Sequence, residues 1–185
     1  MGHSSWRAAH RTLVAGLSLW AGMVLAGCGQ GDAGTNPGDS VLVEGTSRVA
    51  VTSSGGGLIY VPTGASCHYE ASYDLAVTTG DLSWSVCRVH APYDDPASFM
   101  IETGTRTLTA AERAQATGLI RAVRVTDSSQ CGADKDLLQI AVDSPAGHRI
   151  YGDDFYGCLK TFDLYVNSGA LDNLKAGLNQ LTLVR

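Results

Sequence analysis

Two adjacent carboxylates, Asp153 and Asp154, lie between aromatic residues in the stretch YGDDFYGC at residues 151–158. Two carboxyl groups that face one space can divide the acid and base roles of a reaction. This stretch ends an extended segment, however, and neighbouring side chains of a strand point to opposite faces of a sheet. We therefore expect the two carboxylates to diverge. We interpret Asp154 as a structural carboxylate that accepts backbone or tyrosine hydrogen bonds beside Cys158.

The aromatic residues of the same stretch suggest a second use, as a binding patch. Aromatic side chains in strands commonly pack across the sheet, but exposed ones form recognition surfaces. The candidate binding residues are Asp154, Tyr156 and Tyr151.

Known catalytic motifs are absent from the sequence. It holds no G-x-S-x-G elbow, no H-E-x-x-H pair, no phosphate loop and no dinucleotide fingerprint. A small hydrolytic enzyme would need a cleft built from Asp153 or Asp154, His148 and Tyr156, because a general base must reach its nucleophile. We assign no catalytic residue, no cofactor and no metal. The acidic runs PYDDP and GADKD are interpreted as solvated turns.

The N-terminus carries a targeting signal. Arginines in a short polar head precede an apolar run over residues 13–25, which is too short to span a bilayer comfortably. The run ends in Leu25-Ala26-Gly27-Cys28, which resembles the lipobox of bacterial lipoproteins. The resemblance covers residues 1–28 alone. It implies that Cys28 is lipidated, that residues 1–27 are removed, and that the protein stays on a membrane of the bacterial cell envelope.

The residue after the lipobox indicates which membrane. In the lipoprotein family an aspartate at that position is the usual retention signal for the inner membrane, and this chain has Gly29 instead. The resemblance therefore implies an outer-membrane location.

Four cysteines remain after Cys28, and an even number in an extracytoplasmic chain predicts two disulfides. Three connectivities are possible for them. We favour Cys131 with Cys158, because these residues flank a predicted hairpin. Cys67 with Cys87 then follows by elimination, although it needs a bulge or break near residues 66–70. A zinc site is disfavoured because no C-x-x-C pair exists.

The elements that position these residues alternate between strands and helices. Residues 69–89 predict a hairpin around the turn TTGD, with three apolar pairs on one face: Val77 with Leu82, Leu75 with Trp84, and Tyr73 with Val86. Thr109 and Glu112 have the spacing of a capping box, and a helical apolar stripe follows: Ala116, Leu119, Ile120 and Val123.

A second hairpin and a final helix complete the pattern. A three-residue loop at 145–147 predicts the pairs Val142 with Ile150, Asp143 with Arg149, and Leu137 with Phe155. Ser168 is a suitable N-cap for a helix with one leucine face: Leu171, Leu174, Leu178 and Leu181. The predicted fold class is α+β, in two layers: an antiparallel sheet of two β-hairpins with two helices packed on one face, in the order hairpin-helix-hairpin-helix.

Three segments are expected along the chain. Residues 1–27 are a signal peptide, residues 28–57 are the lipid anchor and a glycine-rich tether, and residues 58–185 form one disulfide-stabilised domain. One or two edge strands are expected within residues 41–60, where β-branched runs are broken by glycines.

Composition sets the class of partner. The 185 residues carry 13 basic and 18 acidic side chains, and residues 1–27 hold two arginines and no acid, so the mature chain would carry a net charge of −7. This charge disfavours nucleic acid as a partner. We expect a membrane-anchored extracytoplasmic lipoprotein with a small binding or structural domain, whose partners are the membrane and an envelope or secreted protein. The alternatives are a small hydrolytic enzyme or an inhibitor of a secreted hydrolase.

Overall fold

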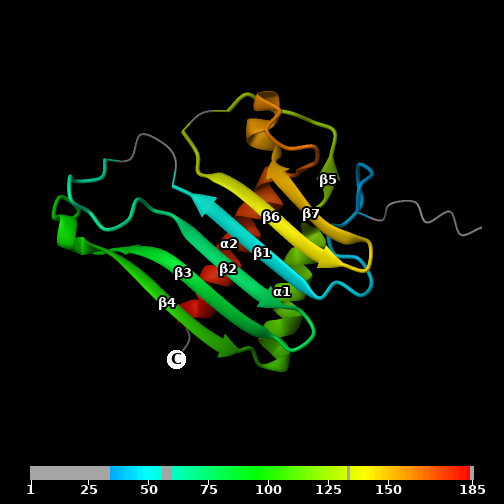
Figure 1. The fold of residues 1–185 in the computed structure, drawn as a ribbon, viewed down its shortest axis with the longest axis horizontal. Helices are drawn as coiled ribbons and strands as arrows, with labels where there is room; N and C mark the ends of the chain where they lie inside the picture. The colour runs from blue at the N-terminus through cyan, green and yellow to red at the C-terminus, as the bar shows by residue number, and fades with distance from the viewer. Residues whose placement is uncertain (1–33, 56–59, 133, 184–185) are drawn as a thin grey trace, which may run out of the picture.

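The computed structural model describes residues 34–55, 60–132 and 134–183 (Figure 1). The predicted signal peptide and Cys28 lie outside the described residues.

In the described part of the chain, one mixed sheet of eight strands organises the fold, in the order β4-β3-β2-β1-β6-β7-β8-β5. All pairings are antiparallel except that of β7 with β8. The strands are β1 (Arg48–Ser54), β2 (Ala71–Ala76), β3 (Asp81–Val89), β4 (Phe99–Thr107), β5 (Val125–Thr126), β6 (Leu137–Ser144), β7 (Gly147–Asp153) and β8 (Tyr165–Val166). The prediction of an α+β fold is confirmed, but the sheet is larger than the two hairpins that we predicted.

Two α-helices, α1 (Ala110–Ala122) and α2 (Ser168–Leu183), cross one face of the sheet (Figure 1). Thr109 caps α1 with the predicted capping box, in which its side chain accepts from the Glu112 N–H while the Glu112 carboxylate accepts from the Thr109 N–H. Ser168 is the first residue of α2, and the carbonyl of Asn167 accepts from the Leu171 N–H. The predicted leucine face is buried: Leu171, Leu174, Leu178 and Leu181. Two short 3₁₀ turns, η1 (Pro96–Ser98) and η2 (Asp154–Leu159), follow β3 and β7.

The first predicted hairpin forms between β2 and β3, but its register differs by two residues. Leu75 lies opposite Leu82, and Tyr73 lies opposite Trp84. The connection takes the four residues 77–80 and ends at Gly80, which has a φ of 82°. Because the shift is even, the predicted side chains still face the helices.

The second hairpin, between β6 and β7, differs from its predicted register by one residue. Ser144 pairs with Gly147, which has a φ of 107°, so the loop holds two residues and not three. A shift of one residue moves every side chain of a strand to the other face. Tyr151 therefore lies opposite Ile140 in the core, whereas Ile150 is exposed on the uncovered face.

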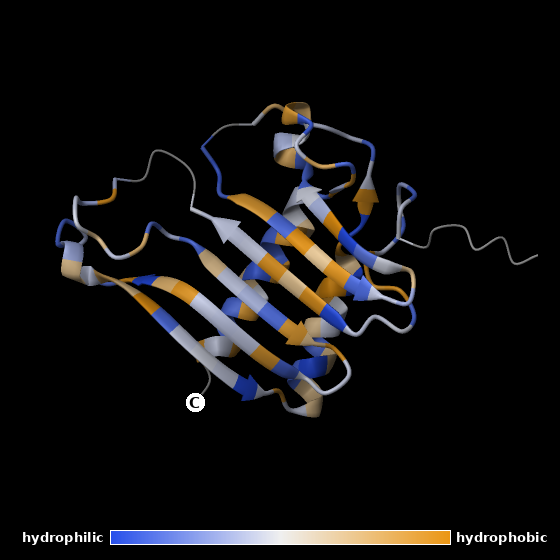
Figure 2. Cartoon of the chain, in the orientation of Figure 1, coloured by the Kyte–Doolittle hydropathy of each residue, from blue (hydrophilic) through white to orange (hydrophobic). Residues whose placement is uncertain are grey.

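The predicted tether over residues 28–57 is wrong for its described part. Strand β1 lies in the middle of the sheet, between β2 and β6, and not at an edge. Val49 and Val51 are buried, and Figure 2 shows orange segments within β1. Before β1, the Val41 N–H donates to the Val123 carbonyl at 3.1 Å. The packed domain thus includes residues well before Leu58.

The central position of β1 can be tested by placing a charge on each of its faces. Val51 is fully buried, so Val51→Asp should lower the free energy of unfolding by at least about 3 kcal/mol in urea denaturation, because an unpaired carboxylate would enter the core. Thr52→Asp on the uncovered face is the matched control and should change stability by less than about 1 kcal/mol. Equal, small effects of both substitutions would mean that this segment is a tether after all.

Candidate functional site

A cavity of about 320 Å³ lies between α2 and the sheet, where β2 and β3 pass beneath the helix. The helix contributes residues at helical spacing, three or four positions apart: Asp172, Lys175, Ala176 and Asn179. The sheet side contributes apolar and aromatic groups together with Arg88: Tyr69, Ala71, Tyr73, Val86 and Cys87. This combination of an apolar floor and a few convergent polar groups is typical of sites for small ligands.

A hydrogen-bonded group of three residues forms one wall of the cavity. The amide oxygen of Asn179 accepts from the Tyr73 hydroxyl at 3.1 Å and from the Arg88 guanidinium. Arg88 also donates to the Thr182 hydroxyl at 2.6 Å. Burial raises the pKa of Tyr73 to about 12, although the positive charge of Arg88 acts in the opposite direction. Tyr73 is therefore a neutral donor over the physiological pH range.

A second polar group stands where α2 meets β1 and β6. Lys175 of α2 forms an ion pair with Asp136 and donates to the Ser53 hydroxyl at 2.9 Å. Ser53 in turn donates to the same carboxylate oxygen of Asp136 at 3.0 Å. The rim of the cavity thus carries cations and carboxylates, each of which is paired with another residue of the protein.

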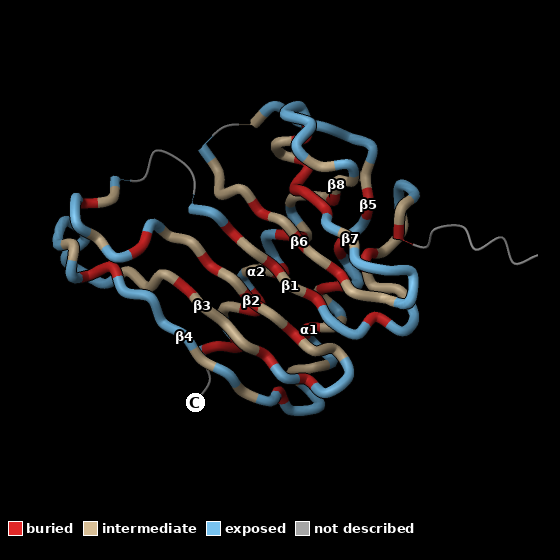
Figure 3. Tube along the Cα trace, in the orientation of Figure 1, coloured by how far each residue is buried: buried red, intermediate tan, exposed pale blue. Residues whose placement is uncertain are grey.

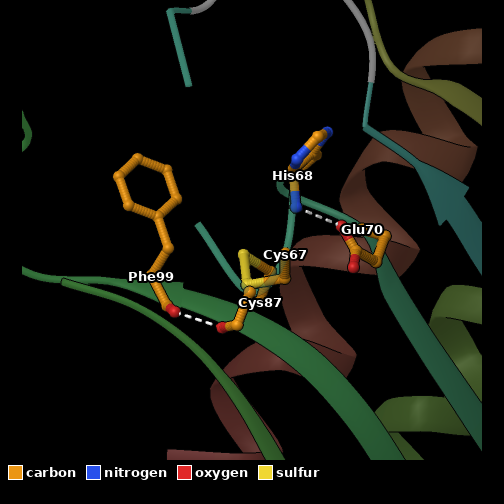
Figure 4. The surroundings of a disulfide bond; sticks show 6 residues. Cys67, His68, Glu70, Cys87 and Phe99 are labelled. Carbon is orange, nitrogen blue, oxygen red and sulfur yellow. Dashed lines mark hydrogen bonds between the residues drawn. A yellow bond between two sulfur atoms is a disulfide. The ribbon is translucent and has the colours of Figure 1, made fainter. Parts of the chain in front are cut away.

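The disulfide between Cys67 and Cys87 (Figure 4) lies beside this cavity, because Cys87 is one of the residues that line it. Its Cα atoms are 5.7 Å apart. The interruption of the strand that this pairing requires is present, because Tyr69 has a φ of 68° and β2 begins only at Ala71. The ring of Tyr69 packs edge-on against Phe99 at 5.5 Å between centroids. The left-handed backbone and the disulfide together hold Tyr69 at the cavity.

The second disulfide joins Cys131 to Cys158, the pair that we favoured, with its Cα atoms 5.3 Å apart. It ties the segment before β6 to the η2 turn after β7. The Gly132 N–H also donates to the Phe155 carbonyl at 2.8 Å. This disulfide therefore closes the end of the hairpin at which Asp153 and Asp154 lie.

Asp153 and Asp154 are both buried, and they bind different groups. Asp153 pairs with the ammonium of Lys135 at 2.6 Å and accepts from the Phe155 N–H at 2.9 Å. Asp154 accepts from the Ser168 N–H, at the first residue of α2, at 2.9 Å, and from the Ser128 hydroxyl at 3.0 Å. A carboxylate at a helix N-terminus satisfies a donor that has no partner within the helix. Asp154 thus has the backbone hydrogen bond that we expected of a structural carboxylate.

Lys135 and Ser168 touch within this cluster, which raises the question of a serine–lysine nucleophile. The Lys135 ammonium contacts the Ser168 hydroxyl and also pairs with Asp172 at 2.9 Å. Burial acts to lower the pKa of Lys135, but the hydrogen bonds that its ammonium donates to Asp153 and Asp172 outweigh this effect, and the pKa is raised. A lysine that remains protonated cannot accept the serine proton. The cluster is therefore suited to holding α2 in place.

Both candidate tyrosines use their hydroxyl groups inside the fold. Tyr151 is 1% exposed and donates to the Gly34 carbonyl at 2.8 Å. Tyr156 accepts from the Lys135 N–H at 2.9 Å and donates to the Lys135 carbonyl. Figure 3 shows the end of β7 as buried. A binding role for Asp154, Tyr156 and Tyr151 remains a prediction, and the geometry gives all three a structural use.

His148 and Asp95 have partners away from Asp153 and Asp154. His148 pairs with Asp143 on the uncovered face, and it stands five residues from Asp153 along β7. At the rise of a strand this separation is about 16 Å, too far for proton transfer between them. Asp95 caps η1 by accepting from the Ala97 N–H. Within residues 34–55, 60–132 and 134–183 no group of three potential metal ligands gathers.

The residues that line the cavity were missed by sequence reasoning as a site. Tyr73 was identified only as a core-facing aromatic residue, and Arg88 and Asn179 were not singled out. Arg88 follows Cys87 in a strand, and Asn179 lies between leucines of a helix. The available signal was that each is a polar residue within an element that packs on the core. Their meeting depends on how the helix crosses the sheet.

Comparisons with known proteins found no matching family model, no matching curated protein and no matching solved structure. Among the described residues, no helix has the length and apolar character needed to cross a membrane.

The structural role of Asp154 can be tested with two substitutions. Asp154→Ala should lower the free energy of unfolding by about 1 to 3 kcal/mol, because it leaves the Ser168 N–H without its acceptor. Asp154→Asn retains an oxygen acceptor and should lose less. Chemical denaturation followed by circular dichroism measures both. If the alanine variant were as stable as the native protein, the carboxylate would not be needed to hold α2.

Proposed function

We propose that this protein is a lipid-anchored binding protein of the bacterial cell envelope, and that its domain binds a ligand in the cavity beneath α2. The observation that carries the binding function is the cavity itself, in which Tyr73, Arg88 and Asn179 converge over an apolar floor. The sequence over residues 1–28 supports the anchor, and the two disulfides agree with an oxidising compartment.

The chemistry of the cavity defines a ligand class. A volume of about 320 Å³ is at the lower end for small-molecule sites, so the ligand is a small molecule or one side chain of a peptide. Tyr73 and Val86 suit an apolar or ring-shaped body. Arg88 donates to Asn179 and Thr182, and these hydrogen bonds orient its guanidinium. Its remaining N–H groups suit an acceptor group on the ligand.

A hydrolytic function is less well supported. The residues that it requires are dispersed, since His148 and Asp153 stand at opposite ends of β7. The remaining serine–lysine contact holds a protonated lysine between two carboxylates. Inhibition of a secreted hydrolase would be one form of binding. Identification of the bound partner distinguishes an inhibitor of a hydrolase from a binding protein for another ligand.

Lipid anchoring is tested with Cys28→Ala in the full-length chain. The variant should move from the membrane fraction to the soluble fraction, because the acyl chains that would hold the protein can no longer be attached. Cell fractionation followed by immunoblotting measures the distribution, and Cys28→Ala in a chain without the signal segment gives the soluble reference. Unchanged membrane association would refute the anchor.

Ligand binding is tested by blocking the cavity from its rim. Ala176 is exposed and lines the cavity, so Ala176→Trp should fill the mouth while leaving the leucine face of α2 intact. The chain is purified from envelope extract, and bound molecules and proteins are identified by mass spectrometry. We expect at least a tenfold loss of the bound species in the variant.

The matched control for this experiment is Gln180→Trp. Gln180 is also exposed on α2 but does not line the cavity, so this variant should retain the bound species at the native level. Equal retention by both variants would place binding elsewhere. If the native chain carries no molecule or protein, the binding function is contradicted.

A further inference from the structure

Strand β4 presents an edge of the sheet that is open except at Phe99, whose carbonyl accepts from the Ser66 hydroxyl. Among the described strands it pairs with β3, and it ends the strand order. The His90 N–H donates to the Ser98 carbonyl and the Leu108 N–H to the Gly80 carbonyl, so even-numbered residues of this segment bond to the β3 side. The odd-numbered residues therefore turn their backbone N–H and C=O groups outward: Ile101, Thr103, Thr105 and Thr107.

The edge lacks several of the usual protections against pairing with another chain. Natural edge strands are commonly short, or carry lysine, proline or a bulge. Phe99–Thr107 contains neither lysine nor proline, and it keeps one unbroken register with β3 over all nine residues. The side chains of Met100 and Ile101 are about half exposed, at 52% and 51%. Figure 3 shows most of β4 as exposed.

The sequence of β4 is complementary to itself in one antiparallel register. If a two-fold axis passes through Gly104, then Glu102 of each copy lies opposite Arg106 of the other. On the uncovered face, Thr103 lies opposite Thr105 and Ile101 opposite Thr107, which are cross-strand pairs of β-branched residues. The outward backbone groups of these four residues face each other in this register, as an antiparallel ladder requires.

Both charged residues are positioned for this pairing by contacts within their own chain. Arg106 donates to the Leu181 carbonyl at 3.0 Å and pairs with Glu112 at 2.6 Å. Glu102 lies 3.4 Å from Arg88 and is 46% exposed. Each would gain an opposite charge from the second copy, and no like charges meet across the two strands.

The residue at the proposed axis has no side chain. A Cβ at Gly104 would lie 2.3 Å from the indole of Trp84, so the ring of Trp84 packs directly on this backbone. Two glycines opposite each other leave room for close approach of the strands at the axis.

We propose that β4 pairs antiparallel with β4 of a second copy of this chain, about a two-fold axis at Gly104, so that one sheet continues through both copies. The symmetry makes the contact self-complementary and closed. The proposal rests on β4 and does not depend on the proposed ligand-binding function.

Two variants of the full-length chain test the interface and its register. The double substitution Thr103→Lys with Thr105→Lys places lysine opposite lysine at two exposed pairs. The matched control, Thr103→Lys with Thr105→Glu, changes the same two residues but places lysine opposite glutamate. Opposite charges support a cross-strand pair, and like charges oppose it.

Association is measured by co-purification of two differently tagged copies from the same cells. The tags are inserted in the exposed turn at residues 145–146, which lies away from β4 (Figure 1). We expect the native chain and the lysine–glutamate variant to co-purify equally, and the lysine–lysine variant to do so at least about tenfold less. A mixture of the lysine–lysine chain with a Thr103→Glu and Thr105→Glu chain should restore association.

Each other outcome overturns the proposal. Absence of co-purification by the native chain would exclude the dimer. Equal association of all variants would place the interface away from β4. Loss of association in both the lysine–lysine and lysine–glutamate variants, with native circular dichroism, would exclude this register. Capture of a different protein by β4 in place of a second copy would show that the edge serves another partner.

Discussion

The packing of α2 onto the sheet is the interaction on which the rest of the structure depends. Four leucines at spacings of three and four residues form a buried face against the strands: Leu171, Leu174, Leu178 and Leu181. Burial of each such side chain contributes about 1.5 to 3 kcal/mol. With the leucines held, the adjacent side of the helix lies over β2 and β3. Asn179 then meets Tyr73 and Arg88, and the cavity has its upper wall.

Polar contacts set the position of α2 along its length. Asp154 accepts from the first residue of the helix, Lys175 pairs with Asp136 near its middle, and Arg106 donates to the Leu181 carbonyl near its end. A half-buried charge needs a partner to offset the loss of its hydration. These groups therefore have structural partners inside the fold, and of them only Asp154 was a candidate site residue in the sequence.

Features that depend on neighbouring residues were predictable. Thr109 and Glu112 form the expected capping box, since both groups lie within one helical turn. The leucine face of α2 follows from its spacing in the same way. The pairing of Cys131 with Cys158 was favoured because these residues flank a hairpin, and that of Cys67 with Cys87 then followed by elimination. Asp153 ends β7 and Asp154 begins η2, and their carboxylates bind Lys135 and the Ser168 N–H respectively.

The sequence alone thus determined the helices and the α+β class, because each is encoded by residues close in the chain or by a period, and it favoured the cysteine pairs without excluding the other connectivities. Only the tertiary structure decided the strand registers, the central place of β1, and the meeting of Tyr73, Arg88 and Asn179. A change of one residue in the length of a turn moves every side chain of the following strand to the other face of the sheet, as the burial of Tyr151 shows. Strands β1 and β6 pair although they are nearly a hundred residues apart in the chain. The alternation of apolar residues in β1 is compatible with an edge strand or a central strand, so its pairing partners depend on the packing of the whole sheet.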